Sequence, residues 1–237
     1  MQKDTKKNWD KVSMNQMGRN WQVFLDHKPL KSPHGEILNL DFELAKKVFK
    51  EWQNIDDKLS AVEMPYYSFV VTTIDRIIPQ KHFVIDKLVS ILNKDLVCYW
   101  ENNNNELKNI HSKQWKPIIN WFEKKFEVKL ILSKGIIPIN QSQTSLFKIK
   151  TLIQQFDNYY ISGLHELASL SGSLVLTLAL FYEKISLNEF YKKSFIDEFY
   201  QSKKWGEDKE AIERRENIFT QFKQAFKFIK LIKKINS

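Results

Sequence analysis

Histidine, serine and cysteine residues in this sequence do not occur at the spacings that metal binding or nucleophilic catalysis requires. His165 is followed by Glu, as in a zinc-protease motif, but Ser169 stands where the second histidine is needed. The Ser-Gly-Ser run at 171–173 lacks the flanking residues of a hydrolase nucleophile elbow. The one cysteine, Cys98, cannot form a zinc site of several cysteines. We therefore expect no catalytic residue, no metal ligand and no enzymatic activity.

The glycines of the chain are too far apart to hold a phosphate group. A dinucleotide-binding fingerprint needs glycines two residues apart, and a P-loop needs two glycines separated by four residues before a lysine. Neither spacing occurs among the six glycines of this sequence. We therefore expect no nucleotide cofactor and no other cofactor.

One segment near the C-terminus combines carboxylates with a tryptophan. Asp197 and Glu198 lie on a predicted helix that ends near Trp205, and Asp208 opens the next helix after Gly206. A tryptophan beside charges in a turn is typical of an anchor for another protein. In the alternative, structural interpretation, Trp205 fills the core and Asp208 caps the last helix. A hydrolase site built from the carboxylates is a further alternative, but no partner base or metal ligand is identifiable.

The chain carries a formal charge of +9, which can attract nucleic acid, an anionic membrane or an acidic protein. One face of the predicted last helix carries Lys223, Lys227, Lys230 and Lys234. A surface for nucleic acid usually mixes such lysines with exposed aromatic rings, whereas the aromatic residues of this helix recur at core spacing. We expect no nucleic-acid partner. A basic nucleic-acid-binding protein is nevertheless the alternative function, and a steep salt dependence of binding would favour it.

The predicted secondary structure changes from strands to helices along the chain. Short strands are predicted around Val12 and Met14, over residues 21–25 and over residues 35–40. From Asp41, which can cap a helix, apolar residues recur mostly at helical spacing. The fold class is therefore α+β. A small N-terminal antiparallel β subdomain, residues 1–60, precedes a larger all-helical domain, residues 61–237.

Four predictions concern details of the helical part. Residues 66–78 fit either a strand or a helix, because β-branched residues also keep helical spacing. Pro117 is expected to restart or kink a helix that begins at Glu106. A short strand is expected over residues 129–132, and two helices are expected within residues 144–182.

Several motifs, taken in order, resemble the ATP-twelve family, the assembly chaperones of the ATP synthase F-one alpha subunit. The run VFLDHKPLKSP at 23–33 resembles the family's L-D-G-R-P-L-K-T-P element, and E-W-Q at 51–53 and M-P at 64–65 follow it. The later matches are T-I-D at 73–75, D-L-V-C-Y at 95–99, Q-W-K-P at 114–117, L-S-G-S at 170–173 and W-G-E-D-K-E-A at 205–211. The chain departs from the family at His27, where glycine is usual, and at Trp100, where arginine is expected.

The resemblance implies a non-enzymatic chaperone that binds the F-one alpha subunit and promotes assembly of the alpha/beta head. New alpha subunits expose surfaces that later contact beta subunits, and exposed apolar patches of that size aggregate. A protein that covers these surfaces until beta displaces it prevents aggregation without hydrolysing nucleotide. In the family an acidic residue of the C-terminal corner takes part in function, and Glu198 is the match. The partner-binding residues that we expect are Glu198, Asp197, Trp205 and Asp208.

The sequence also predicts where the protein works. The longest uncharged stretch, residues 167–182, has sixteen residues, fewer than the roughly twenty of a membrane span. Residues 1–10 lack the apolar region of a secretory signal. We expect no membrane insertion, a bacterial cytoplasmic location (or the mitochondrial matrix in a eukaryote) and a monomer.

Overall fold

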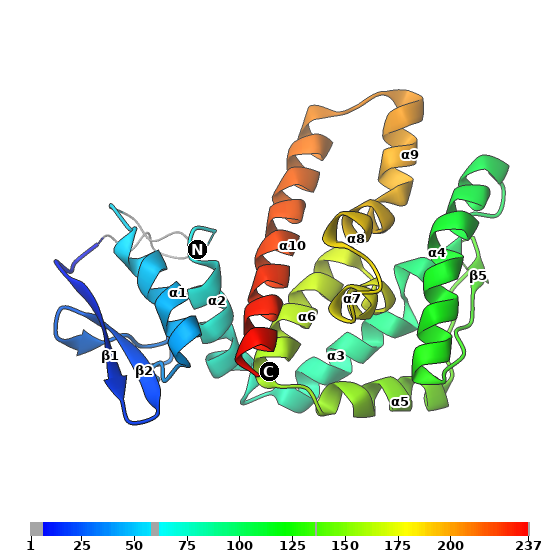
Figure 1. The fold of residues 1–237 in the computed structure, drawn as a ribbon. Coiled ribbons are helices and arrows are strands. Elements are labelled where there is room, and N and C mark those ends of the chain that lie inside the picture. The colour runs from blue at the N-terminus through cyan, green and yellow to red at the C-terminus, as the bar shows by residue number, and fades with distance from the viewer. Residues whose placement is uncertain (1–6, 58–61, 136, 237) are drawn as a thin grey trace. The chain divides into compact units, whose positions relative to one another are not determined.

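The computed structural model describes residues 7–57, 62–135 and 137–236 (Figure 1). The chain divides into two compact units. Unit 1 contains residues 1–81, 158–163 and 227–237, and unit 2 contains residues 82–157 and 164–226. The predicted domain boundary at residue 60 stays a prediction. The compact units have other bounds, because residues 158–163 and 227–237 belong to unit 1 together with the N-terminal residues.

Unit 1 begins with a three-stranded antiparallel sheet. Its strands are β1 (Val12–Met17), β2 (Asn20–Leu25) and β3 (Lys28–Pro29), in the order β1-β2-β3. The register pairs Met17 with Asn20, so residues 18 and 19 form the hairpin turn. Gly18 has a φ of 65°, which glycine adopts without steric cost. The predicted small N-terminal antiparallel sheet is thus confirmed.

The third strand of this sheet is not the one that alternation predicted. Residues 35–40 make only isolated bridges, of Lys31 with Ile37 and of Trp21 with Leu40. Leu38 and Leu40 are nevertheless fully buried in the core of unit 1. The alternation therefore reflects alternate burial of side chains along an extended segment, without a continuous ladder of backbone hydrogen bonds.

Two helices complete the N-terminal part of unit 1. α1 (Phe42–Gln53) begins at Asp41, whose Oδ1 accepts a hydrogen bond from the Glu43 N–H at 2.9 Å, as predicted. The carboxylate of Glu51 accepts hydrogen bonds from the N–H groups of Tyr66 and Tyr67, both at 2.8 Å. These two N–H groups lie in the first turn of α2 (Pro65–Thr72). Burial of the carboxyl group raises the pKa of Glu51 to about 7.

Residues 66–78 are helical. α2 is followed directly by a π-helical turn, Thr73–Ile77. Phe69 stacks on Phe228, a residue of the last helix that also belongs to unit 1, at a ring separation of 4.7 Å. Tertiary packing therefore decides in favour of the helix, although the β-branched residues favoured a strand.

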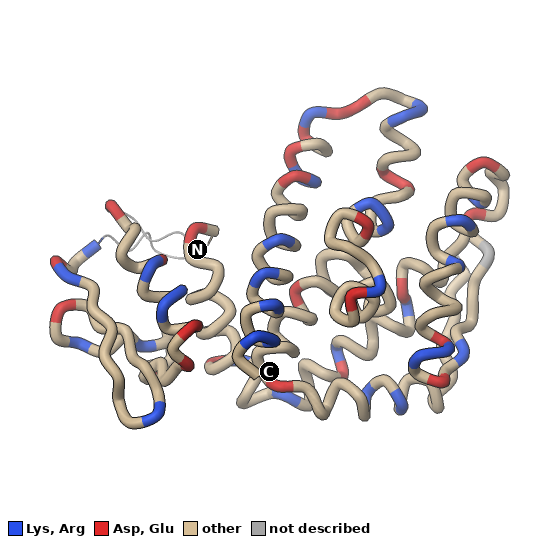
Figure 2. The backbone as a smooth tube through the Cα atoms, in the orientation of Figure 1, with Lys and Arg blue, Asp and Glu red and all other residues tan. Residues whose placement is uncertain are grey.

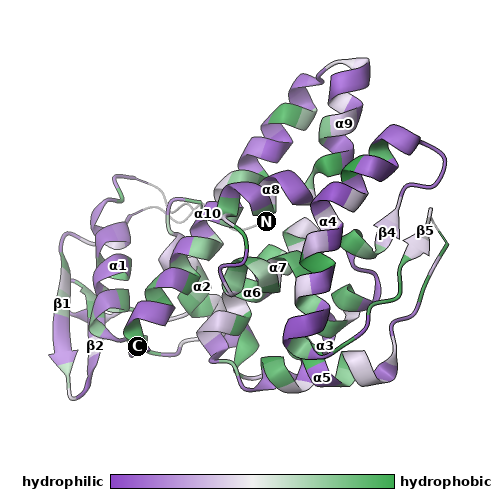
Figure 3. Ribbon diagram, turned by 45° about the vertical axis from the view of Figure 1, so that its right-hand side comes forward, coloured by the Kyte–Doolittle hydropathy of each residue, from purple (hydrophilic) through white to green (hydrophobic). Residues whose placement is uncertain are grey.

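Unit 2 is almost entirely helical. Its helices, three of which extend into unit 1, are α3 (Lys81–Asn93), α4 (Asn105–Phe126), α5 (Gln143–Gln154), α6 (Asn158–Ser171), α7 (Leu174–Phe181), α8 (Leu187–Ser194), α9 (Ile196–Trp205) and α10 (Lys209–Ile235). Two short strands, β4 (Tyr99–Trp100) and β5 (Ser133–Lys134), pair in parallel. All eight residues of α7 are buried, and its apolar composition is visible in Figure 3. Within the described ranges, no helix has the length and apolar character needed to cross a membrane.

The predictions for unit 2 need three corrections. α4 continues through Pro117 without a break, and Pro117 lies on its exposed side. Because proline has no N–H, the carbonyl group four residues earlier in the helix lacks its usual hydrogen-bond donor. On the exposed side of the helix, water can donate to that carbonyl group instead. The strand expected over residues 129–132 lies at Ser133–Lys134. Residues 144–182 contain parts of three helices, because Gly172 ends α6 with a φ of 67°.

Asp95 joins two segments of the unit 2 core. Its Oδ1 accepts hydrogen bonds from the Ser173 hydroxyl at 2.6 Å and from the Val97 N–H at 3.2 Å. Its Oδ2 accepts a hydrogen bond from the Val175 N–H, in the first turn of α7, at 2.9 Å. Complete burial raises the pKa of Asp95 to about 6. The D-L-V-C-Y and L-S-G-S motifs thus meet at one buried carboxylate.

Candidate partner-binding site

The four candidate residues all lie in unit 2, on α9 and the loop that joins α9 to α10 (Figure 1). α9 ends at Trp205, and Gly206, with a φ of 91°, turns the chain. The Asp208 carboxylate accepts a hydrogen bond from the Ala211 N–H at 3.2 Å. Asp208 therefore caps the start of α10, as the structural interpretation predicted. Figure 2 shows acidic residues at this loop and basic residues farther along α10.

Trp205 is the most exposed large apolar side chain among the described residues. Its exposed fraction is 77%. The interpretation in which Trp205 fills the core is therefore wrong. An indole in this position adds little to folding, whereas tryptophan is the residue most enriched at the energetic centres of protein interfaces.

Glu198 connects α9 to α10. Its Oε2 lies 2.5 Å from Nη2 of Arg214 and 3.7 Å from Nη1 of Arg215. The Arg215 side chain is only 5% exposed, whereas Glu198 is 32% exposed. Arg215 also lies over the Phe199 ring, 5.4 Å from its centre, and donates a hydrogen bond to the Ser202 hydroxyl at 3.4 Å. Glu198 therefore neutralises a buried cation and keeps part of its own carboxylate in solvent.

Asp197, the preceding residue, contacts a different helix. Its Oδ1 lies 2.6 Å from Nε2 of His111, a buried residue of α4. Nδ1 of His111 accepts a hydrogen bond from the Glu101 N–H at 3.1 Å. The second nitrogen, Nε2, must then carry the proton and donate it to Asp197. The imidazole also stacks on Trp115 with ring centres 4.0 Å apart.

The arrangement is suited to holding helices together. A histidine beside an aspartate can act as a general base, but both nitrogens of His111 are used and its ring is 2% exposed. Among the residues that the structure describes, no group of three or more His, Cys, Asp or Glu side chains is placed to hold a metal ion. Asp197 and Glu198 therefore hold α9 to α4 and α10, and they leave Trp205 at the exposed end of α9.

Sequence reasoning did not identify His111 as a partner of Asp197. The two residues are 86 positions apart, and neither belongs to a recognisable spacing. The only available signal was the position of His111, four residues before the tryptophan of the Q-W-K-P motif. This spacing places the two side chains on one helix face, where they stack.

Comparison with known proteins gives consistent matches. A model of the ATP12 chaperone protein family matches residues 6–123. Atp12 from Paracoccus denitrificans has 27% identity and a TM-score of 0.88, with 95% of this chain and 97% of that chain covered. An aspartate-to-lysine mutant of P. denitrificans Atp12p gives the same values. The Atu1473 protein of Agrobacterium tumefaciens has 25% identity and a TM-score of 0.88, with 96% of this chain and 86% of that chain covered.

Proposed function

The chain belongs to the ATP12 chaperone family, and on that premise we propose that it binds the alpha subunit of the ATP synthase F-one sector and promotes assembly of the alpha/beta head. The supporting observation is that the family match and the similarity to P. denitrificans Atp12 agree, the latter over 95% of the chain. Binding would cover alpha-subunit surfaces that aggregate when exposed.

In this proposal the chaperone acts by binding alone and is not an enzyme. The client is held until a beta subunit competes for the same surface, and release then follows from mass action. Neither nucleotide hydrolysis nor a cofactor is needed. The protein works as a monomer in the compartment where F-one assembles, the bacterial cytoplasm or the mitochondrial matrix.

The α9–α10 corner is the proposed contact site. Trp205, exposed and at the end of α9, is the anchor that enters a pocket of the alpha subunit. Asp197 and Asp208 position the corner through His111 and the first turn of α10. Glu198 has both roles, because it binds Arg214 while its exposed part faces the partner.

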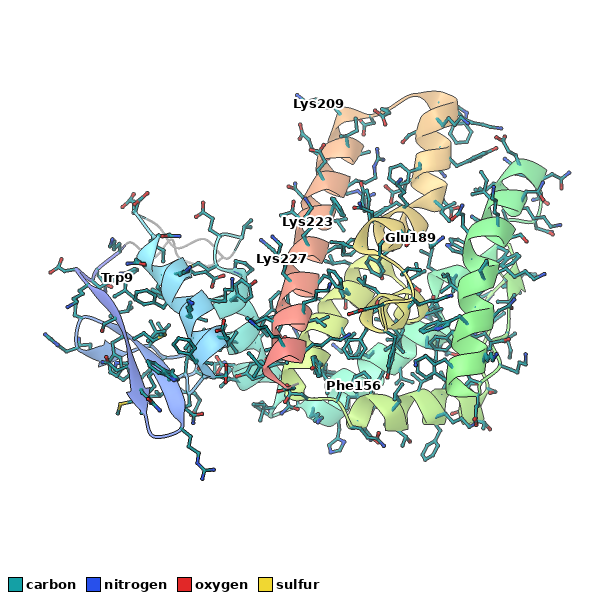
Figure 4. The ribbon with its side chains drawn as sticks, in the orientation of Figure 1. Trp9, Phe156, Glu189, Lys209, Lys223 and Lys227 are labelled. Carbon is teal, nitrogen blue, oxygen red and sulfur yellow. The ribbon has the colours of Figure 1, made fainter. Side chains whose placement is uncertain are left out.

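The rival function, nucleic-acid binding, has less support from the last helix. Lys223 and Lys227 extend from successive turns of α10 (Figure 4) and are exposed. The neighbouring aromatic residues Phe222 and Phe228 are fully buried, so they are not available to stack on bases. Binding to random nucleic acid that falls steeply with salt would favour the rival function.

Co-purification tests the proposal. The tagged chain is expressed in its own organism and recovered from the extract under mild conditions, and the bound proteins are identified by mass spectrometry. The proposal predicts recovery of the F-one alpha subunit without the beta subunit. Recovery of assembled alpha/beta head, or of neither subunit, would contradict it.

A further inference from the structure

A groove of about 400 Å³ lies along α9 on the side that faces α4 and α8. It is distinct from the corner, although it shares α9 with it. Ile110, Ile196 and Phe199 give the groove its apolar surface, and Lys192, Lys203 and Glu106 supply its charged groups. The volume is at the lower end of the roughly 300–1,000 Å³ typical of ligand pockets. It therefore admits a few side chains of a partner rather than a whole domain.

The walls of the groove are held in place without a partner. The His111 hydrogen bond to Asp197 joins α4 to the first turn of α9. Farther along α9, the hydroxyl group of Tyr200 accepts a hydrogen bond from the Asn104 side chain at 2.7 Å. A preformed groove loses little conformational entropy on binding, which favours affinity.

The charged groups of the groove are unequally paired. Glu106 accepts a hydrogen bond from the Tyr200 hydroxyl at 3.1 Å and pairs with Lys204, also at 3.1 Å. Lys192 and Lys203 are exposed and, within the described part of the chain, have no ion-pair partner within 4.0 Å. Glu106 also interacts electrostatically with Lys203, but its hydrogen bonds go to Tyr200 and Lys204. The groove lining therefore carries two lysines against one carboxylate, beside an apolar surface.

We propose that this groove receives a short alpha-subunit segment with two or three apolar side chains flanked by carboxylates. The apolar side chains lie against Ile110 and Phe199, and the carboxylates pair with Lys192 and Lys203. This proposal rests on the proposed function and names the chemistry of the client segment. Apolar anchors flanked by complementary charges are the usual way in which a groove recognises an amphipathic segment.

Paired charge reversals test the proposal with purified alpha subunit. Lys192→Glu combined with Lys203→Glu reverses both groove cations, and Lys108→Glu combined with Lys116→Glu makes the same charge change on exposed lysines of α4 that do not line the groove. We expect at least a tenfold loss of affinity for the first pair and less than a twofold change for the second. Circular dichroism and thermal melting of both variants verify that they are folded.

A photo-reactive amino acid at position 110 then identifies the occupant. The proposal predicts one crosslinked alpha-subunit peptide, containing apolar residues next to Asp or Glu. A peptide without acidic residues would overturn the charge assignment. A crosslink to a second copy of this chain would overturn the choice of occupant.

The binding measurement also separates this proposal from the proposed function. Equal affinity of both charge variants, with strong binding by the wild type, would overturn the groove and leave the alpha-subunit function intact. A wild-type chain that does not bind the alpha subunit would overturn the function itself, and the groove assignment with it.

Discussion

Asp197 and His111, 86 residues apart in the chain, form a hydrogen bond of 2.6 Å between Oδ1 and Nε2. The bond joins α9 to α4 and satisfies a buried ring nitrogen that has no other partner in the described residues. Because Glu198 contacts α10, two consecutive carboxylates attach α9 to two helices. The position of the exposed corner therefore depends on these contacts.

Loss of the Asp197 carboxylate should destabilise the protein. Asp197→Ala leaves the Nε2 proton of His111 buried without an acceptor, and we expect the free energy of unfolding in urea to fall by about 1–3 kcal/mol. Asp197→Asn retains an acceptor oxygen and serves as the control, with a smaller loss. Equal stability of the alanine variant and the wild type would show that the hydrogen bond does not hold α9.

Trp205→Ala should weaken binding of the alpha subunit and leave the stability of the fold unchanged. Since the side chain is 77% exposed, its removal should change the free energy of unfolding by less than about 0.5 kcal/mol. Loss of an interface anchor should lower affinity for the alpha subunit by a factor of about thirty or more. Exposed Phe147 is the matched control, because Phe147→Ala also removes an exposed aromatic ring from unit 2. Unchanged affinity of Trp205→Ala would exclude the tryptophan from the interface.

Charge reversal at Glu198 should affect both stability and binding. Glu198→Lys would place three cations together, and Glu207, 4.0 Å away, would be the one carboxylate that the described residues still offer to buried Arg215. We expect a stability loss of roughly 2–3 kcal/mol. Glu198→Gln can keep a hydrogen bond to Arg214 and should cost less.

The role of Glu198 toward the partner requires binding data on the folded variants. Affinity for the alpha subunit is measured well below each melting temperature. A loss of affinity in Glu198→Gln without a matching loss of stability would support direct contact with the partner. Native affinity in both folded variants would mean that Glu198 acts only inside this chain.

Glu51 should make the stability of the protein depend on pH. Its pKa is about 7 in the folded chain, raised by burial from a usual value of 4.5. Between these values the folded chain binds more protons than the unfolded chain, so the free energy of unfolding falls as pH rises. The stability linked to this group is complete below about pH 4.5 and lost as pH rises through about 7.

Denaturation at several pH values, with Glu51→Gln as the reference, isolates this effect. The variant cannot titrate at this position, so its stability should fall less between pH 5 and pH 8, by roughly 2 kcal/mol relative to the wild type. Parallel pH profiles for the two proteins would mean that the carboxyl group of Glu51 is ionised throughout that range.

Local signals in the sequence predicted much of the fold. Asp41 marks a helix start that the structure contains. The predictions were wrong where burial alone sets the pattern, as at residues 35–40, and where exposure relieves the cost of a proline, as at Pro117. In both places the burial or exposure of the segment in the folded chain, which the local pattern does not record, determined the outcome.

Residues of the family motifs contact one another inside the fold. The Ser32 hydroxyl donates a hydrogen bond to Asp75 at 2.6 Å, and Ser173 donates one to Asp95 at 2.6 Å, so motifs far apart in the chain bind each other. These residues hold the fold. The groove beside α9 carries no such signal, because its lining combines residues of α4 with residues of α8 and α9, which lie much later in the chain.

The affinity of the purified chain for purified F-one alpha subunit, measured by titration with and without beta subunit, tests directly whether this chain binds alpha and yields it to beta. We expect saturable one-to-one binding that does not require nucleotide. We also expect added beta subunit to displace the chain from the alpha subunit. If the chain does not bind alpha, or if beta cannot displace it, the proposed function is wrong.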